Sequence, residues 1–213
     1  MSKLDFAALL CSRLCHDLVS PVGAINNGLE LLSGEEDPNM REAVFDLIEK
    51  STLQTSNKLQ FFRLAFGAAG GFSAHLDTRE AEKSLRAFLA GSKVDLDWNV
   101  TVAELSKGAV KLLLNLSLVG AEALIRGGEL SVSFIAEGED SLSLRMEASG
   151  ERVILPDVVH AAVEGDIEEA SLEPRAAPAY LAYAVAQELG GSIEVALAAD
   201  TQLIVTSTIR SSV

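Results

Sequence analysis

The first 66 residues contain two long stretches of helical periodicity separated by one short break, and this feature constrains the fold more than any other. In the first stretch, large apolar residues recur at spacings of three, four or their sums, which is typical of one helix face. They are Leu10, Leu14, Leu18, Ile25, Leu29 and Leu32. The break contains Gly34, which can end a helix, and then Asp37 and Pro38, which suit the N-cap and the first turn of the next helix. This second helix is predicted from about residue 38 to residue 66, with an apolar stripe of Met40, Val44, Leu47, Ile48, Leu59 and Phe62.

The short connection makes the two helices antiparallel neighbours, so the sequence predicts a helical hairpin over residues 1–68. Two helices alone cannot hide both apolar stripes from water. Two hairpins can hide them by forming a four-helix bundle. We therefore expect a homodimer through this region, and burial of the stripes against the C-terminal part of the same chain is the alternative.

A glycine- and alanine-rich segment at residues 67–71 is typical of a linker, and the pattern changes after it. Helices are predicted near residues 79–90, 107–126 and 179–189, and strands near residues 94–100, 130–135, 141–146, 193–197 and 202–209. The two middle strands pair around a turn at residues 137–140, and the last two form a closing hairpin. The predicted class is α+β, in which the helical hairpin is followed over residues 73–213 by an α/β two-layer sandwich with helices on one face of its sheet.

Charge and composition exclude several classes of partner. The 213 residues include 17 Lys and Arg against 31 Asp and Glu, a net charge of −14, so nucleic acid is not expected as a direct partner. No uninterrupted apolar run reaches the roughly 20 residues of a membrane span, and no signal-peptide pattern is present, so we expect a cytoplasmic protein without membrane contact. Cys11 and Cys15 are expected to be small buried residues. No metal site is expected, because the chain has three His residues and no second ligand pair.

One polar cluster interrupts the first helix and is the best candidate for chemistry. His16 and Asp17 lie one turn before Pro21, which cannot donate a hydrogen bond to the carbonyl of Asp17 and should loosen the helix there. A neutral imidazole is a good nucleophile near pH 7. Asp17 is the nearest carboxylate that could orient the ring and accept its proton, although adjacent helix residues do not normally face each other. An isolated His on a helix is usually only solvated, and His75 and His160 have no comparable setting.

The surroundings of His16 are predicted to be polar and spacious. Its own helix face carries small or polar residues, namely Ser12, Arg13, Ser20, Gly23 and Asn27. If the hairpin turns near residues 35–36, the level of His16 lies opposite Thr52, Thr55 and Ser56, whose short side chains leave room for a bulky group on the imidazole. A His-Asp pair also begins the metal site of HD-type phosphohydrolases, but these need a further His upstream, and none precedes His16.

The segment from His16 to Pro21, followed by Ile25 and residues 30–32, resembles the H box of the dimerisation and phosphotransfer domain of two-component histidine kinases. The C-terminal part resembles the ATP-binding domain of these kinases. Residues 112–116 resemble the start of the N box, residues 148–150 stand where the first glycine box would be, and residues 188–194 resemble the helix end after the second glycine box.

The departures from the kinase pattern are as informative as the matches. The metal-holding Asn of the N box falls on Val119, and the adenine-reading Asp of the first glycine box falls on Ala148. Three glycine positions carry Arg152, Ala176 and Pro178. The family's nucleotide site depends on a carboxylate, an amide and close backbone approach. The resemblance therefore implies a degenerate domain that does not bind ATP and has no intrinsic cofactor.

The whole chain resembles the ChpT-type histidine phosphotransferases. This resemblance implies a homodimer in a two-component phosphorelay of cell-cycle control. His16 would accept a phosphoryl group from the receiver domain of a CckA-type hybrid kinase and pass it to response regulators of the CtrA and CpdR type. The receiver would supply Mg²⁺, and Arg175 is a candidate contact to it. The alternatives are an active histidine kinase with an atypical nucleotide site and a non-catalytic dimeric scaffold or kinase inhibitor.

Overall fold

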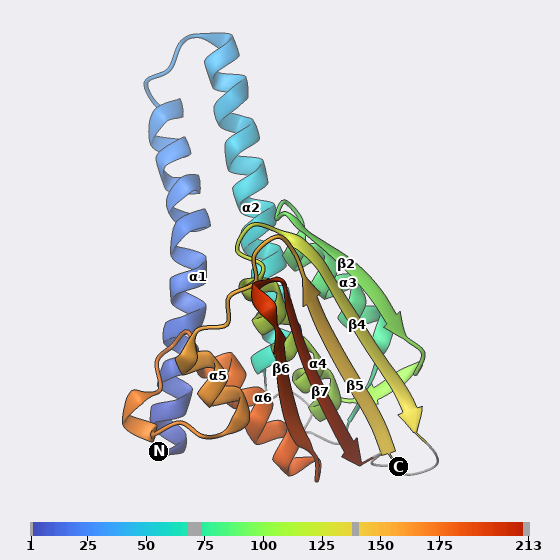
Figure 1. Cartoon of the computed structure of the whole chain (residues 1–213). Coiled ribbons are helices and arrows are strands. Elements are labelled where there is room, and N and C mark those ends of the chain that lie inside the picture. Colours follow the sequence, from blue (N-terminus) through green and yellow to red (C-terminus); the bar gives the residue numbers. More distant parts are fainter. Residues whose placement is uncertain (1, 68–73, 138–140, 211–213) are drawn as a thin grey trace.

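The computed structural model describes residues 2–67, 74–137 and 141–210. It begins with the predicted hairpin, formed by α1 (Lys3–Leu32) and α2 (Pro38–Phe66) (Figure 1). Each helix has a polar cap that the local sequence explains. The hydroxyl of Ser2 accepts from the backbone N–H of Asp5 at 3.1 Å, and the carboxylate of Asp37 accepts from the backbone N–H of Asn39 at 2.9 Å. The predicted antiparallel helical hairpin is confirmed.

The rest of the chain forms an α/β sandwich. Its helices are α3 (Thr78–Leu89), α4 (Lys107–Ala123), α5 (Asp157–Glu164) and α6 (Ala177–Glu188), and its strands are β1 (His75–Asp77), β2 (Val94–Val100), β3 (Glu104–Ser106), β4 (Gly128–Glu137), β5 (Ser141–Ser149), β6 (Ser192–Ala198) and β7 (Gln202–Arg210). Short 3₁₀ turns lie at Glu169–Ser171 and Ala199–Thr201. The main sheet has the order β2-β4-β5-β7-β6, with only the β2–β4 pair parallel. The predicted class is therefore confirmed, whereas α5 and the small β1–β3 sheet were not predicted as elements.

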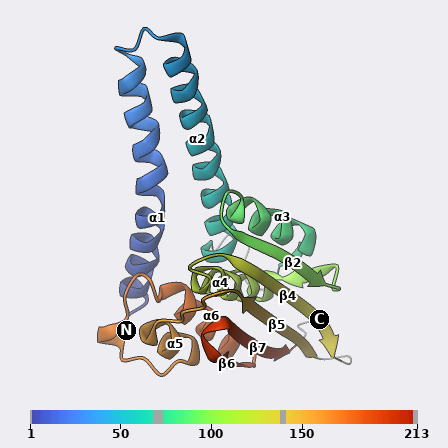
Figure 2. The ribbon, with the colours of Figure 1, turned by 45° about the horizontal axis from the view of Figure 1, so that its top comes forward.

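Helices α3, α4 and α6 cover one face of the main sheet and separate it from the hairpin (Figures 1 and 2). Strand β2 alternates strictly between partly buried and exposed residues, as expected for a sheet with one open face. Helix α4 is buried over most of its length, because the sheet lies on one side of it and the hairpin and α6 lie on others. This position explains why its sequence is apolar on every face.

The lower part of the hairpin shares the core of the sandwich. Phe61 and Phe62 of α2 are at most 1% exposed, and Phe61 stacks on Phe88 of α3 with 4.2 Å between ring centroids. On α1, Phe6, Leu9, Leu10 and Leu14 pack against the same core. The alternative of burial against the C-terminal part is therefore correct for this half of the hairpin. The predicted boundaries at residues 68 and 73, most of the linker and most of the turn at 137–140 lie outside the described residues.

The upper part of the hairpin projects beyond the sandwich (Figure 2) and leaves large apolar side chains exposed. They include Val19, Val22, Leu29, Leu31, Met40, Phe45, Leu47 and Leu53. Cys11 and Cys15 are exposed free thiols, so the prediction of buried cysteines is wrong. Both belong to α1.

Helix α1 is long and apolar enough to cross a membrane by length and composition alone, whereas the sequence predicted no such span. The same composition has a second explanation within the fold. One face of α1 packs into the core of the sandwich and another carries the exposed apolar residues, so that few positions remain for charges.

The shared core can be tested with two phenylalanines of α2. Phe62→Ala should lower the free energy of unfolding by about 3–5 kcal/mol, because it removes a fully buried ring from the junction of hairpin and sandwich. Phe45→Ala is the matched control, since Phe45 is 55% exposed, and should cost less than about 1 kcal/mol. Chemical denaturation followed by circular dichroism measures both. Equal effects of the two substitutions would contradict a shared core.

Candidate functional site

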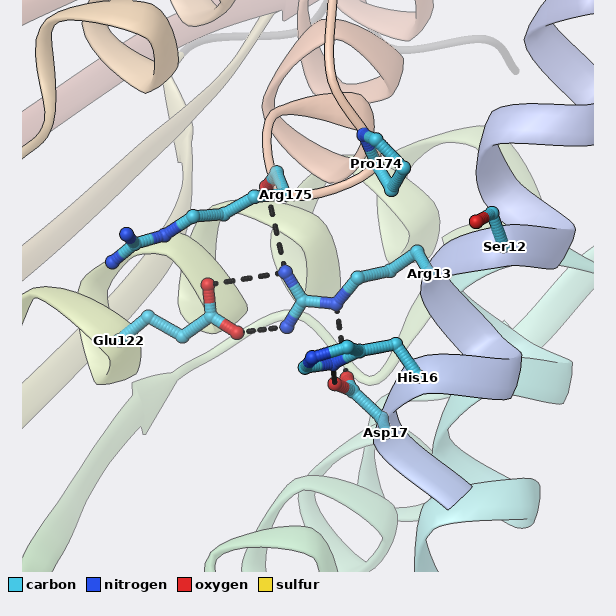
Figure 3. A pocket seen from close by; sticks show the side chains of 7 residues that line it. All are labelled: Ser12, Arg13, His16, Asp17, Glu122, Pro174 and Arg175. Carbon is cyan, nitrogen blue, oxygen red and sulfur yellow. Dashed lines mark hydrogen bonds and ion pairs between the residues drawn. The ribbon is translucent and has the colours of Figure 1, made fainter. Parts of the chain in front are cut away.

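His16 lies at the edge of a pocket of about 520 Å³ at the junction of α1, α4 and the loop before α6 (Figure 3). The lining residues are Ser12, Arg13, His16, Asp17, Glu122, Pro174 and Arg175. The side chain of His16 is 85% exposed. A partner that approaches this face of α1 can therefore reach the imidazole directly.

Asp17 contacts the ring of its neighbour in the sequence. Its Oδ1 atom lies 3.2 Å from Nδ1 of His16, while its own side chain is only 14% exposed. When Nδ1 carries the ring proton it donates to this carboxylate, and the lone pair of Nε2 is left free for attack. The contact that Asp17 needs in order to orient the ring of His16 is therefore present.

Arg13 connects Asp17 to the sandwich. Its Nε donates to Oδ2 of Asp17 at 3.0 Å, and its two Nη atoms donate to the carboxylate of Glu122 on α4. Nη1 also lies 3.4 Å from the carbonyl oxygen of Arg175. Arg13 lines the pocket beside His16, on the face where the sequence placed it, but its side chain is only 7% exposed. It turns toward α4 and the loop before α6, where the carboxylate of Glu122 and the carbonyl of Arg175 accept from it.

The charge of Arg13 is well supported in its buried position. Burial acts to lower the pKa of Arg13, but the hydrogen bonds and negative charges of Glu122 and Asp17 outweigh it and raise the pKa above its usual value. The guanidinium is therefore a permanent cation between two carboxylates. A buried charge is tolerated in a protein when it is paired and hydrogen-bonded in this way.

Pro21 is buried inside α1, and the helix continues through it from Lys3 to Leu32. Pro21 has no backbone N–H to donate to the carbonyl of Asp17. This carbonyl accepts instead from Nζ of Lys58 on α2 at 3.0 Å. The loosening predicted beside His16 is therefore not seen as a break in the helix. The second helix of the hairpin supplies the missing donor.

Ser20, Gly23 and Asn27 continue the face of His16 toward the tip of the hairpin, at the spacing of one helix side. Ser20 and Asn27 are exposed. A Cβ atom added to Gly23 would meet no atom within 4 Å, so the backbone of α1 can be approached closely at this point.

The three hydroxyl residues predicted opposite His16 do not line its pocket. Gly28 of α1 lies against Val44 and Ile48 of α2, so His16, twelve residues earlier, is level with residues 56–60. Thr52 and Thr55 lie nearer the hairpin tip and bond to carbonyls of their own helix, at 2.7 and 2.8 Å, and Ser56 stands at the margin. The predicted level was about one turn wrong, because the true register depends on side-chain packing between the helices.

Arg175 does line the pocket, but it contributes its backbone rather than its charge to the contacts described above. Its side chain is exposed and, in Figure 3, its guanidinium points away from α1. Within the described residues, no group of three or more His, Cys, Asp or Glu side chains could hold a metal ion.

Four of the five positions at which the chain departs from the kinase pattern are packed inside the protein. Val119, Ala148, Ala176 and Pro178 are buried, and Arg152 is exposed. Asn115, in the segment that resembles the N box, is fully buried and donates to the carbonyls of Ala65 at 2.9 Å and of Lys111 at 2.8 Å. Its amide therefore joins α4 to the end of α2.

Residues 78–201, more than half of the chain, match the model of the histidine phosphotransferase C-terminal domain. The chain belongs to the histidine phosphotransferase family. It is 38% identical over 196 residues to the protein phosphotransferase ChpT of Brucella abortus (strain 2308), which covers 92% of this chain and 91% of that protein. The predicted family and the predicted phosphotransferase activity in a phosphorelay are thus confirmed.

A solved bacterial phosphotransferase has the same fold over nearly its whole length. It is 34% identical to this histidine phosphotransferase, with a TM-score of 0.85 and coverage of 97% of both chains. The histidine kinase AdeS of Acinetobacter baumannii is also similar, at 16% identity and a TM-score of 0.46 over 93% of this chain and 98% of that one.

Sequence reasoning missed Glu122 and Lys58 as parts of the site and did not foresee the buried contacts of Arg13. The i, i+4 spacing of Arg13 and Asp17 was a visible signal for their ion pair. Glu122 was visible only as a charge in an apolar helix, and nothing in the sequence indicated which residue it would meet. The contact of Lys58 depends on the register of the hairpin.

The role of Lys58 can be tested by removing its charge. Lys58→Met should lower the free energy of unfolding by about 1–3 kcal/mol, because the Asp17 carbonyl would lose a charged donor. Lys50→Met is the control, since Lys50 is exposed and its pair with Asp46 spans 3.8 Å, and it should change stability by less than about 0.5 kcal/mol. Urea denaturation measures both variants. A neutral effect at Lys58 would contradict the contact.

Proposed function

We propose that His16 is the phosphoacceptor of this histidine phosphotransferase. The observation that supports it is the combination of a ring that is 85% exposed at a pocket and a mostly buried carboxylate at 3.2 Å from its Nδ1 atom. Of the other two histidines, His160 lies 3.4 Å from Glu164 of its own helix, and His75 is in the short strand β1. Neither of these two histidines lines the pocket.

In the proposed reaction, the phosphoryl group moves in line from a receiver aspartate to His16, through a loose transition state. The receiver supplies Mg²⁺ and the charges that stabilise the moving group, so this chain needs no cofactor of its own. Phosphohistidine and acyl phosphate are both reactive, which makes the transfer reversible. The same site can then pass the phosphoryl group to the aspartate of a response regulator.

We propose that the receiver docks along the face of α1 that carries His16, Ser20, Gly23 and Asn27. This face is polar or small and is open to solvent, and the absence of a side chain at Gly23 lets a helix of the receiver come close. Arg175 stands on the sandwich side of the same pocket, where its exposed guanidinium can meet an acidic group of the docked partner. Thr52, Thr55 and Ser56 are on the other helix, nearer the tip of the hairpin.

We propose that the sandwich does not bind ATP and that the chain is not a kinase. Small or apolar side chains occupy four of the five positions where the kinase family holds nucleotide, at residues 119, 148, 176 and 178, and all four are buried. The amide nitrogen of Asn115 donates to two backbone carbonyls, and its amide oxygen is buried with no hydrogen-bond partner among the described residues. A carboxylate for adenine is missing at residue 148, and an amide for Mg²⁺ is missing at residue 119.

We propose a homodimer formed by the exposed apolar face of the hairpin. Leu4, Cys11, Cys15, Val22 and Leu29 lie along one side of α1 at intervals of seven or four residues, the spacing at which two helices pack together. All five are exposed in the single chain. His16 follows Cys15 by one residue and so points about 100° away from this stripe, which leaves it accessible in a dimer.

The family relationship suggests the partners. With 38% identity to a ChpT over 92% of the chain, we propose that the donor is the receiver domain of a CckA-type hybrid kinase and that the acceptors are response regulators of the CtrA and CpdR type. Such a relay operates in the cytoplasm. The negative charge of this chain suits regulators with basic DNA-binding domains.

Transfer of labelled phosphate tests the phosphoacceptor. Incubation with a ³²P-labelled receiver should give the wild type an acid-labile, base-stable label, and His16→Ala should remain unlabelled, since its only proposed acceptor nitrogen is gone. His160→Gln is the matched control and should be labelled like the wild type. In the same assay, Mg-ATP without a receiver should leave the wild type unlabelled. Relay through His16→Ala would refute the proposal, and self-labelling from ATP would favour the kinase alternative.

The dimer proposal predicts a change of mass in solution. Val22→Arg should convert a dimer into a monomer in light-scattering chromatography, because it places a charge in an apolar interface. Glu30→Lys, on an exposed polar position of the same helix, should remain dimeric. A monomeric wild type, or a dimeric Val22→Arg variant, would contradict this interface.

A further inference from the structure

Arg13 contacts both carboxylates that line the pocket of His16, those of Asp17 and Glu122, and the backbone carbonyl of Arg175 (Figure 3). Building on the function proposed above, we propose that Arg13 is a positioning residue for phosphoryl transfer. It holds the carboxylate of Asp17 against Nδ1 of His16, so that Nε2 carries the phosphoryl group, and it anchors this arrangement to α4 and to the loop before α6. The sandwich would then be part of the reactive site and not only a platform for partners.

The geometry of the guanidinium makes this assignment specific. A guanidinium is planar, and its donors lie along fixed directions in that plane. The Nε donor of Arg13 meets Oδ2 of Asp17 at 3.0 Å, and its Nη donors meet both carboxylate oxygens of Glu122. The plane cannot turn without breaking one of these pairs. Oδ1 of Asp17 is consequently held on the side of His16.

The ring of His16 depends on this support. It is 85% exposed, so packing does not hold it, and the contact described for its ring nitrogens is the one with Asp17. Imidazole in water exchanges its proton between both nitrogens. The Asp17 carboxylate selects the form with the proton on Nδ1, and Arg13 selects the position of the carboxylate.

The selected form suits the transfer chemistry. The lone pair of Nε2 forms the N–P bond while the P–O bond to the receiver aspartate breaks, and the electrons of that bond leave on the receiver carboxylate. The proton on Nδ1 stays in place, so the ring becomes positively charged. That charge develops 3.2 Å from the Asp17 carboxylate, which stabilises it. In the reverse step the same groups return to their starting state.

The connection to the sandwich makes the arrangement rigid. An ion pair between residues four apart on an exposed helix is weak, because water and side-chain motion compete with it. Here Glu122 and the carbonyl of Arg175 occupy the other side of the guanidinium, and the side chain of Arg13 is 7% exposed. The orientation of Asp17 is thereby tied to the contact between α1 and the sandwich.

The full-length chain can be tested with ¹⁵N-labelled histidine and with labelled receiver phosphate. In the wild type, at a pH at which the imidazole is neutral, the ¹⁵N chemical shifts of His16 should show the proton on Nδ1. In Arg13→Met the signals should move toward the form with the proton on Nε2, and transfer should slow by about 10- to 100-fold, as for a displaced reactive group. Arg126→Met is the control, because Arg126 forms an exposed pair with Glu151 at 3.2 Å outside the pocket, and both readouts should stay at wild-type values.

A second variant separates positioning from loss of structure. Glu122→Gln leaves the α1 pair intact but weakens the anchor on α4, and should produce a smaller change in the same direction. A wild-type rate and tautomer in Arg13→Met would overturn the inference and leave the relay through His16 standing. A slower rate with an unchanged tautomer would also overturn it, since Arg13 would then act only on the fold. If wild-type His16 never becomes labelled, the proposed function itself is wrong.

Discussion

Burial of the aromatic end of α2 against α3 and α4 holds the hairpin to the sandwich, and the remaining structure depends on it. Phe61 and Phe62 are inaccessible to water, and the amide of Asn115 ties α4 to the carbonyl of Ala65 at the end of the same helix. With α2 held in this way, α1 is carried along the side of α4 and α6. Only this placement brings Arg13 within reach of Glu122.

Helix α1 serves three surfaces at once, and its sequence reflects all of them. One face enters the core of the sandwich with Phe6, Leu10 and Leu14. A second face is apolar and exposed, and a third face carries His16 with small and polar neighbours. A helix with two apolar faces has little room for charge, which explains why α1 satisfies the length and composition test for a membrane span.

The site next to His16 supplies orientation and space, which is what a relay requires of the carrier of the phosphoryl group. The guanidinium of Arg13 donates to two carboxylates of its own chain, and the imidazole of His16 is exposed to solvent. Four of the five positions at which the chain departs from the kinase pattern are buried, and Arg152 is exposed. Under the proposed function, metal and transition-state charge then come from the docked receiver.

The sequence by itself determined the two helices of the hairpin, the Asp37 cap of the second helix, the α+β class and the candidate pair of reactive side chains, His16 and Asp17. These follow from local properties: apolar periodicity, the residues at helix ends, and two reactive side chains that are adjacent in the chain. The sequence also placed small residues correctly along the open face of α1, as Gly23 shows.

Tertiary structure alone decided the direction of Arg13, the partner of Glu122, the donor that Lys58 supplies beside Pro21, and the level of Thr52 and Thr55. Each depends on how two segments that lie far apart in the chain pack together, or on the register between α1 and α2 of the hairpin. Helical periodicity predicts the helix face on which a residue lies. It does not predict how deeply that face is buried or which residues it contacts. For this reason the proposed phosphoacceptor His16 and its neighbour Asp17 could be predicted from the sequence, and the contacts of Arg13 with Glu122 that hold Asp17 in place could not.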